Sequence, residues 1–104
     1  MLYICDLEMY IPGMEIICTE DALEALKDLK STKPSKFVRV TIDYSRQSCN
    51  ILFEDVFSKY EKGSFFSEPV CNVFLEFKHF KKKDLIGRVF DYEATIMGRR
   101  FIFR

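Results

Sequence analysis

The sequence predicts a single α+β domain, and three observations support this prediction. The 104 residues suit one ordinary domain, and no repeat or linker-like tract divides them. Several segments alternate apolar and polar residues with the two-residue period of a strand, and two others carry apolar residues at helical spacing. We therefore expect one domain over residues 1–104, with elements in the order β-β-α-β-α-β-β-β.

The N-terminal segment predicts a β-hairpin that turns at Pro12-Gly13. In this register Ile11 pairs with Met14 and Leu7 pairs with Cys18, which places apolar side chains on one face.

A helix is expected from Thr19 to about Lys30. Thr19 can cap its first turn, where the acidic residues Glu20 and Asp21 suit the positive end of the helix dipole. Residues 37–44 then alternate apolar and polar side chains and predict a strand.

A second amphipathic helix is expected over residues 49–60, because apolar residues recur there at intervals of three and four. These residues are Cys49, Leu52, Phe53, Val56, Phe57 and Tyr60. A loop over residues 63–69 follows, and residues 70–80 alternate as one long strand.

The last residues predict another hairpin, with Gly98 at the first position of a two-residue turn where the backbone angle φ is positive. This register places Ile96 opposite Phe101, Ala94 opposite Phe103 and Glu93 opposite Arg104.

These elements predict a two-layer domain: a mixed or antiparallel sheet of about five to six strands, with two terminal hairpins and both helices on one face. Six strands span roughly 29 Å at a spacing of about 4.8 Å, whereas two helices cover only about 20 Å. The uncovered part of the sheet favours either a homodimer or a bound partner; a curled sheet or a folded-over hairpin is the alternative.

The sequence suits the cytoplasm. No stretch approaches the roughly 20 apolar residues that span a bilayer, so no membrane contact is expected. The N-terminal residues include Asp6 and Glu8 where a signal peptide is basic and then apolar. The four cysteines lack a C-x-x-C pair, so we expect reduced thiols rather than disulfides or a zinc site.

Catalytic and cofactor motifs are absent from the sequence. His79 is the one histidine, so a catalytic triad would have to include it. The four glycines stand singly, which excludes the common phosphate-binding loops. We therefore expect a protein that is not an enzyme and binds no cofactor or metal.

Aromatic residues are the first candidate binding surface. Phe65 and Phe66 are adjacent in a predicted loop, where one of them can point outward as an anchor for a partner protein. Tyr10, Phe37 and Phe74 lie on strand faces opposite the main apolar sets and extend this surface. The alternative is that these rings pack inside the protein.

A basic C-terminal segment is the second candidate. Net charge is zero, but residues 1–28 carry seven acidic residues and one basic residue, whereas residues 77–104 carry eight basic and three acidic residues. The candidates for binding nucleic acid or an acidic protein surface are Lys78, Lys81, Lys82, Lys83, Arg88, Arg99 and Arg100. The alternative is a solvated strand edge that resists aggregation.

Taken together, the sequence favours a small non-catalytic protein-binding module. It would act as a modulator or inhibitor of a larger protein or complex, as a bacterial or viral accessory protein does to a host protein. One alternative is a nucleic-acid-binding protein that uses the basic segment. A second alternative is a small enzyme whose site the sequence does not reveal.

Overall fold

The protein is an α+β domain, as expected from the sequence. The computed structural model describes residues 2–4, 16–46, 48–58 and 63–104. In these residues the elements are β1 (Leu2–Ile4), β2 (Ile16–Thr19), α1 (Glu20–Thr32), β3 (Phe37–Asp43), β4 (Ser48–Glu54), β5 (Ser64–Val70), β6 (Val73–Lys78), α2 (Lys82–Leu85), β7 (Arg88–Thr95) and β8 (Gly98–Phe103).

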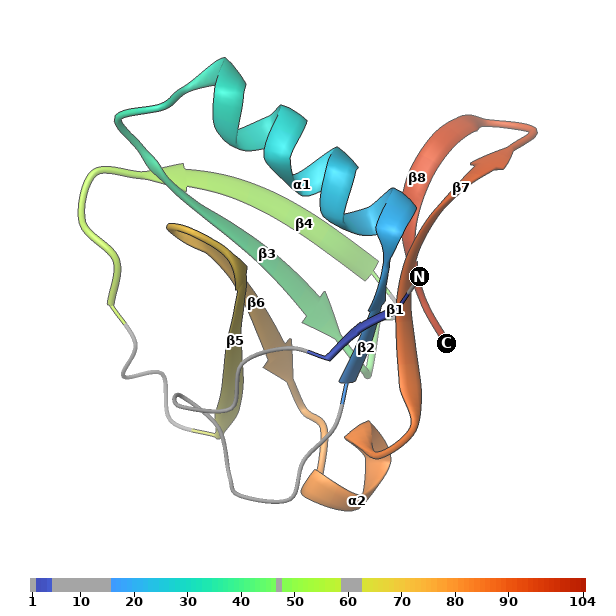
Figure 1. The fold of residues 1–104 in the computed structure, drawn as a ribbon. Helices are drawn as coiled ribbons and strands as arrows, with labels where there is room; N and C mark the ends of the chain where they lie inside the picture. The colour runs from blue at the N-terminus through green and yellow to red at the C-terminus, as the bar shows by residue number, and fades with distance from the viewer. Residues whose placement is uncertain (1, 5–15, 47, 59–62) are drawn as a thin grey trace.

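The strands form two sheets, so the expectation of a single sheet with both helices on one face is wrong (Figure 1). The terminal sheet has the strand order β1-β2-β7-β8, and the middle sheet has the order β4-β3-β6-β5. Each sheet joins two antiparallel hairpins through a parallel central pair, β2 with β7 and β3 with β6.

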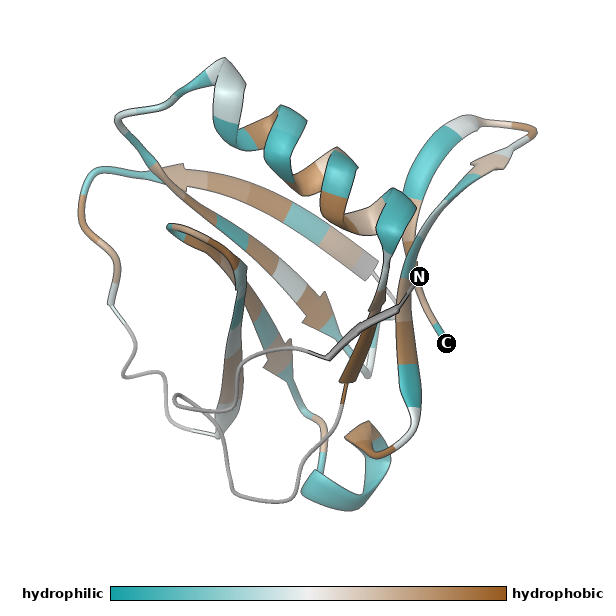
Figure 2. Cartoon of the chain, in the orientation of Figure 1, coloured by the Kyte–Doolittle hydropathy of each residue, from teal (hydrophilic) through white to brown (hydrophobic). Residues whose placement is uncertain are grey.

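The two sheets bury their apolar faces against each other. The core takes Ile16 and Phe90 from the terminal sheet and Val40, Leu75 and Phe77 from the middle sheet. Hydrophobic residues follow these central strands in Figure 2. Because each sheet covers the other, the width mismatch that favoured a dimer does not arise.

The first helix confirms its sequence prediction. The hydroxyl of Thr19 accepts a hydrogen bond from the Ala22 backbone N–H at 3.2 Å, and the acidic first turn is in place. The helix continues to Thr32, slightly beyond the expected end. Ala22 and Leu26 are fully buried and attach α1 to the core between the sheets.

The predicted helix over residues 49–60 is wrong, because residues 48–54 form strand β4. It pairs antiparallel with β3, with Ile51 opposite Val40 and Cys49 opposite Ile42. Cys49 and Phe53 pack against the core, whereas Leu52 is 53% exposed. Over this short run the apolar residues fit both the period of a helix and the period of a strand, and pairing with β3 selects the strand. The second helix is instead the four-residue α2.

The predicted loop over residues 63–69 is also a strand. It forms the β5–β6 hairpin, which turns at Cys71 and Asn72, so residues 70–80 are not one long strand. Asn72 adopts a positive φ of 59°, a conformation that asparagine tolerates. The pairing shifts between Ser67 and Val70, and Pro69, which has no N–H to donate, lies in this irregularity on an edge strand.

Both terminal hairpins differ in register from the prediction. Cys18 pairs with Tyr3 rather than Leu7, and the expected Pro12-Gly13 turn lies outside the described residues. At the C-terminus the turn is at Ile96 and Met97, between the paired residues Thr95 and Gly98.

One detail of the C-terminal prediction is correct, and a second is wrong in register. Gly98 has the expected positive φ, 104°, although it follows the turn instead of opening it. Glu93 lies opposite Arg100 in the ladder, yet its carboxylate still contacts Arg104 at 2.5 Å.

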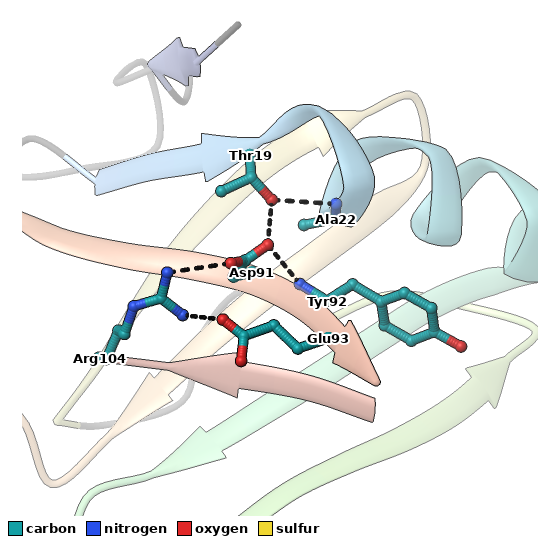
Figure 3. Close-up of polar contacts among 6 residues, drawn as sticks. All are labelled: Thr19, Ala22, Asp91, Tyr92, Glu93 and Arg104. Carbon is teal, nitrogen blue, oxygen red and sulfur yellow. Dashed lines mark hydrogen bonds and ion pairs between the residues drawn. The ribbon is translucent and has the colours of Figure 1, made fainter. Parts of the chain in front are cut away.

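A polar network holds β8, β7 and the start of α1 together (Figure 3). Thr19 donates its hydroxyl hydrogen to Asp91 at 2.6 Å, and the Tyr92 backbone N–H donates to the same carboxylate oxygen at 2.8 Å. Arg104 donates to the second oxygen of Asp91 at 3.0 Å. The pKa of Asp91 is lowered from 3.8, mainly by the hydrogen bond from Thr19.

Replacing Asp91 with asparagine should therefore destabilise the protein. We expect Asp91→Asn to lower the free energy of unfolding by about 1 to 3 kcal/mol at pH 7 in urea titrations. Since the folded pKa is depressed, this contribution is complete above the unfolded pKa and is lost as the pH falls through the folded pKa. Wild type and variant should converge in acid, and the exposed control Asp28→Asn should change little. Equal stability of Asp91→Asn and wild type at pH 7 would contradict this role.

Candidate functional site

A groove of about 1040 Å³ opens between the two sheets beneath α1. Its walls come from four places in the sequence: the second half of α1, the β3–β4 hairpin, Phe80 between β6 and α2, and strands β7 and β8. In Figure 1, α1 runs along the side on which β4 and β8 are the outermost strands of their sheets. The groove therefore lies where the two sheets separate at one edge.

The groove is lined with aromatic rings. Phe103 packs against Phe80 with ring centres 5.4 Å apart, and Tyr92 packs against Phe101 at 4.8 Å. Phe103 also contacts Phe77 of the core at 5.2 Å, so the lining continues into the interior. Packing on both sides keeps these rings in fixed positions, which a binding surface requires.

Exposed apolar side chains extend the lining toward solvent. Ile51 on β4 is 42% exposed, and Tyr44, just after β3, is 48% exposed. Tyr44 meets Phe80 edge to face at 5.0 Å. Both residues line the groove, so its mouth offers apolar surface on the side of the middle sheet.

Arginines provide the charge on the opposite wall. Arg88 lies over the rings of Phe80 and Phe103 and donates from Nε to the Asp84 carbonyl at 2.8 Å. Arg99 lies over the Tyr92 ring at 5.3 Å. Within the described parts of the chain, no carboxylate pairs with Arg99 or Arg100. The acidic residues of the groove, Asp28 and Asp43, lie on α1 and β3 instead.

Three of the five aromatic residues that the sequence nominated as partner anchors gather on the other face of the middle sheet. Phe66 and Phe74 are only 4% exposed, and Phe37 is partly buried against Phe74. Phe57 stacks on Phe74 with ring centres 3.7 Å apart. These rings pack with one another, as in the alternative of interior packing.

Two of the nominated residues lie elsewhere. Phe65 is partly buried and packs against the core. Tyr10 lies outside the described residues.

A buried ion cluster lies beside this aromatic cluster. Arg39, 6% exposed, contacts Glu54 at 3.1 Å and Glu76 at 3.2 Å. Its guanidinium also lies over the Phe57 ring at 4.7 Å and donates to the Ser58 carbonyl at 2.8 Å. The paired charges join β3, β4 and β6 to the segment after β4, which is a structural role.

The nominated basic residues do not form one patch. Lys81, Lys82 and Lys83 are exposed at α2, and Lys78 is partly buried at the end of β6. The second group, Arg99 and Arg100, lies near the other end of β7, because Arg100 is opposite Glu93. Glu93 follows Arg88 by five positions along β7, a distance of roughly 16 Å. Only Arg88, Arg99 and Arg100 of the nominated set line the groove.

His79 contacts a carboxylate but not a nucleophile. Its Nδ1 lies 2.9 Å from Asp43, and its φ is 65°. The Ser45 hydroxyl donates to the same oxygen of Asp43 at 2.8 Å. Serine and histidine thus share an acceptor instead of bonding to each other, which is not the arrangement that activates a serine. The hydrogen bonds from His79 and Ser45 lower the pKa of Asp43 to about 2.

The cysteines carry no disulfide among the described residues. Cys18 is buried and Cys71 is exposed. Cys49 faces the groove, and burial raises the pKa of its thiol to about 12, so it stays protonated at neutral pH. In the described ranges no three metal-ligating side chains come together.

Comparison with known proteins does not assign a family. No family model matches this chain, and no curated protein matches it either. Neither helix in the described part of the chain has the length and apolar character needed to cross a membrane.

Sequence reasoning missed the groove, although it nominated three of its arginines. Phe101 and Phe103 were assigned to the C-terminal hairpin without a binding role, and Ile51 was placed in a helix. One signal was present: Cys49, Ile51 and Phe53 alternate with polar or exposed residues, which indicates a strand with an outward edge.

The Asp43 pKa can be checked directly. A carbon-detected NMR titration should give a carboxyl pKa of about 2. The variants His79→Gln and Ser45→Ala should each raise it toward the ordinary 3.8, because each removes a hydrogen bond to the carboxylate. Since the folded pKa is depressed, stability from Asp43 is present above pH 3.8 and lost as the pH falls toward 2. An unshifted pKa in wild type would contradict the geometry.

Proposed function

We propose that the protein is a non-catalytic protein-binding module of the cytoplasm, which modulates or inhibits a larger protein by contact. The observation that carries this proposal is the groove between β4 and β8. It combines fixed aromatic rings, exposed apolar side chains and the arginines Arg99 and Arg100, which have no ion-pair partner among the described residues, within one surface. Aromatic residues and arginine are the types enriched at protein interfaces.

The dimensions of the groove favour a macromolecular partner over a small ligand. Its volume of about 1040 Å³ lies at the upper end of the range for small-molecule pockets. Its lining includes residues of both edge strands, β4 and β8, so a segment of another protein can lie along them.

The nucleic-acid alternative draws less support from the geometry. Base stacking needs accessible rings beside the positive charges. Phe77 and Phe80, which flank the lysine segment, are 0% and 7% exposed, so only the His79 ring is accessible there. The enzyme alternative rests on His79, Asp43 and Ser45, but the Ser45 hydroxyl bonds to Asp43 and not to His79, the group that would have to activate it.

Affinity capture from lysate tests the proposal. Tagged wild-type protein should retain a protein partner after nuclease treatment. Ile51→Lys places a charge in the apolar mouth and should reduce this capture about tenfold or more. The matched control Ile86→Lys changes an isoleucine that is also exposed, at 57%, but lies outside the groove, and should capture normally.

The same experiment separates the alternatives. Capture that nuclease abolishes, and that falls when Lys81, Lys82 and Lys83 are all changed to glutamate, would favour nucleic acid. Equal capture by Ile51→Lys and wild type would remove the groove from the proposal. Sedimentation of the bait protein alone shows whether a homodimer forms. A catalytic activity that is lost only in the His79→Gln variant would support the enzyme alternative.

A further inference from the structure

We propose that the groove binds an extended acidic segment of the partner, which adds as a strand to the free edge of β8. This inference rests on the proposed function and specifies the chemistry of the partner. Three features of the groove carry it: the direction of the β8 backbone groups, the side chains beside them, and the placement of charge.

The backbone register shows which groups β8 presents at its free edge. Val89 and Arg104 exchange both backbone hydrogen bonds, at 2.6 and 2.9 Å. In an antiparallel pair such bonded positions alternate, so Ile102 and Arg100 also bond toward β7. The N–H and C=O groups of Arg99, Phe101 and Phe103 therefore point away from β7. In the described sheets no strand lies beyond β8 to pair with them.

The β4 edge has the same property. Val38 donates its N–H to the Asn72 carbonyl beside β6, so the alternate residues of β3 bond toward β4. Arg39 then bonds with Leu52, and the backbone of Ile51 points away from β3. Two strand edges that have no neighbouring strand in the described sheets thus border one groove, and an added strand is the standard way for a partner to pair with such an edge.

Side chains alternate along the free edge of β8. Arg99, Phe101 and Phe103 lie on the face that lines the groove, as the contacts with Tyr92 and Phe80 show. Arg100 and Ile102 alternate with them on the other side of the strand, and both also belong to the lining of the groove. A strand added beside β8 would therefore place every second side chain against the phenylalanines, so these positions must be apolar.

The arginines of β8 determine which residues of the added strand are expected to be charged. Arg99 and Arg100 are adjacent at the start of β8, which is hydrophilic in Figure 2, and neither has an ion-pair partner in the described residues. Their guanidinium groups favour carboxylates in the added strand at this end. A second copy of β8, whose sequence is GRRFIF, carries no carboxylate to pair with these arginines, and a helix would leave the backbone edge unpaired.

A peptide display selection tests this inference. A random twelve-residue library is selected on the whole protein and counter-selected on Ile51→Lys. We expect enriched sequences with apolar residues at every second position and aspartate or glutamate near one end. Apolar residues at intervals of three and four, or an excess of lysine and arginine, would overturn the inference, and so would no enrichment over the counter-selection.

One enriched peptide then tests the edge. Labelled for fluorescence anisotropy, it should bind Arg99→Glu and Arg100→Glu at least about tenfold more weakly than wild type. Lys82→Glu and Lys83→Glu make the same charge change at α2 and should bind as wild type does. N-methylation of alternate peptide amides should abolish binding, because it removes the backbone donors that strand addition needs. Two peptides are compared, one N-methylated at the odd-numbered amides and one at the even-numbered amides, and strand addition is refuted if both bind as the unmodified peptide does. Binding that is unchanged in Arg99→Glu and Arg100→Glu would refute it as well.

These outcomes are independent of the capture experiment. If the groove variant loses the cellular partner but the selected peptides lack acidic or alternating character, the binding module stands and the strand inference fails. If Ile51→Lys captures the partner normally, the groove itself is not the binding site. A dimer that Ile51→Lys dissociates would show that a second copy occupies the groove, which also overturns the inference.

Discussion

The structure depends on the burial of two sheet faces against each other. Each sheet has a parallel central pair, and the apolar side chains of these four strands meet in one core, with Phe77 and Phe90 fully buried. Burying one large side chain of this kind contributes roughly 1.5 to 3 kcal/mol. A sheet with one apolar face needs such a cover, and neither α1 nor the short α2 could cover a face alone.

The groove follows from the same arrangement. The central strands carry the core residues, and their hairpin partners β4 and β8 are edge strands, whose residues line the groove together with the second half of α1. Side chains that would be core residues in a closed sandwich, such as Ile51, are therefore partly exposed there. The network of Thr19, Asp91 and Arg104 holds the β8 wall in place relative to α1. The contacts that stabilise the fold therefore also shape the groove.

Local signals predicted local features well. The Thr19 cap and the acidic first turn identified α1, and Gly98 marked a backbone with positive φ. Apolar periodicity gave a wrong prediction where the same residues fitted both a helix and a strand. Cys49, Leu52 and Phe53 suit a helix face, but Cys49 and Phe53 also suit a strand face, and only pairing with β3 selects the strand. Register failed for a related reason: shifts by an even number of residues keep the same side chains inward.

The sequence by itself determined the fold class, the position of α1 and the residue types available for binding. Capping, charge at helix ends and apolar periodicity act over a few residues, so they can be deduced without the fold. The tertiary structure decided the division into two sheets, the burial of Phe66 and Phe74, and the meeting of Ile51 with Arg99 and Phe101 across one groove. These depend on contacts between distant segments, whose free energy exists only once both sheets have formed.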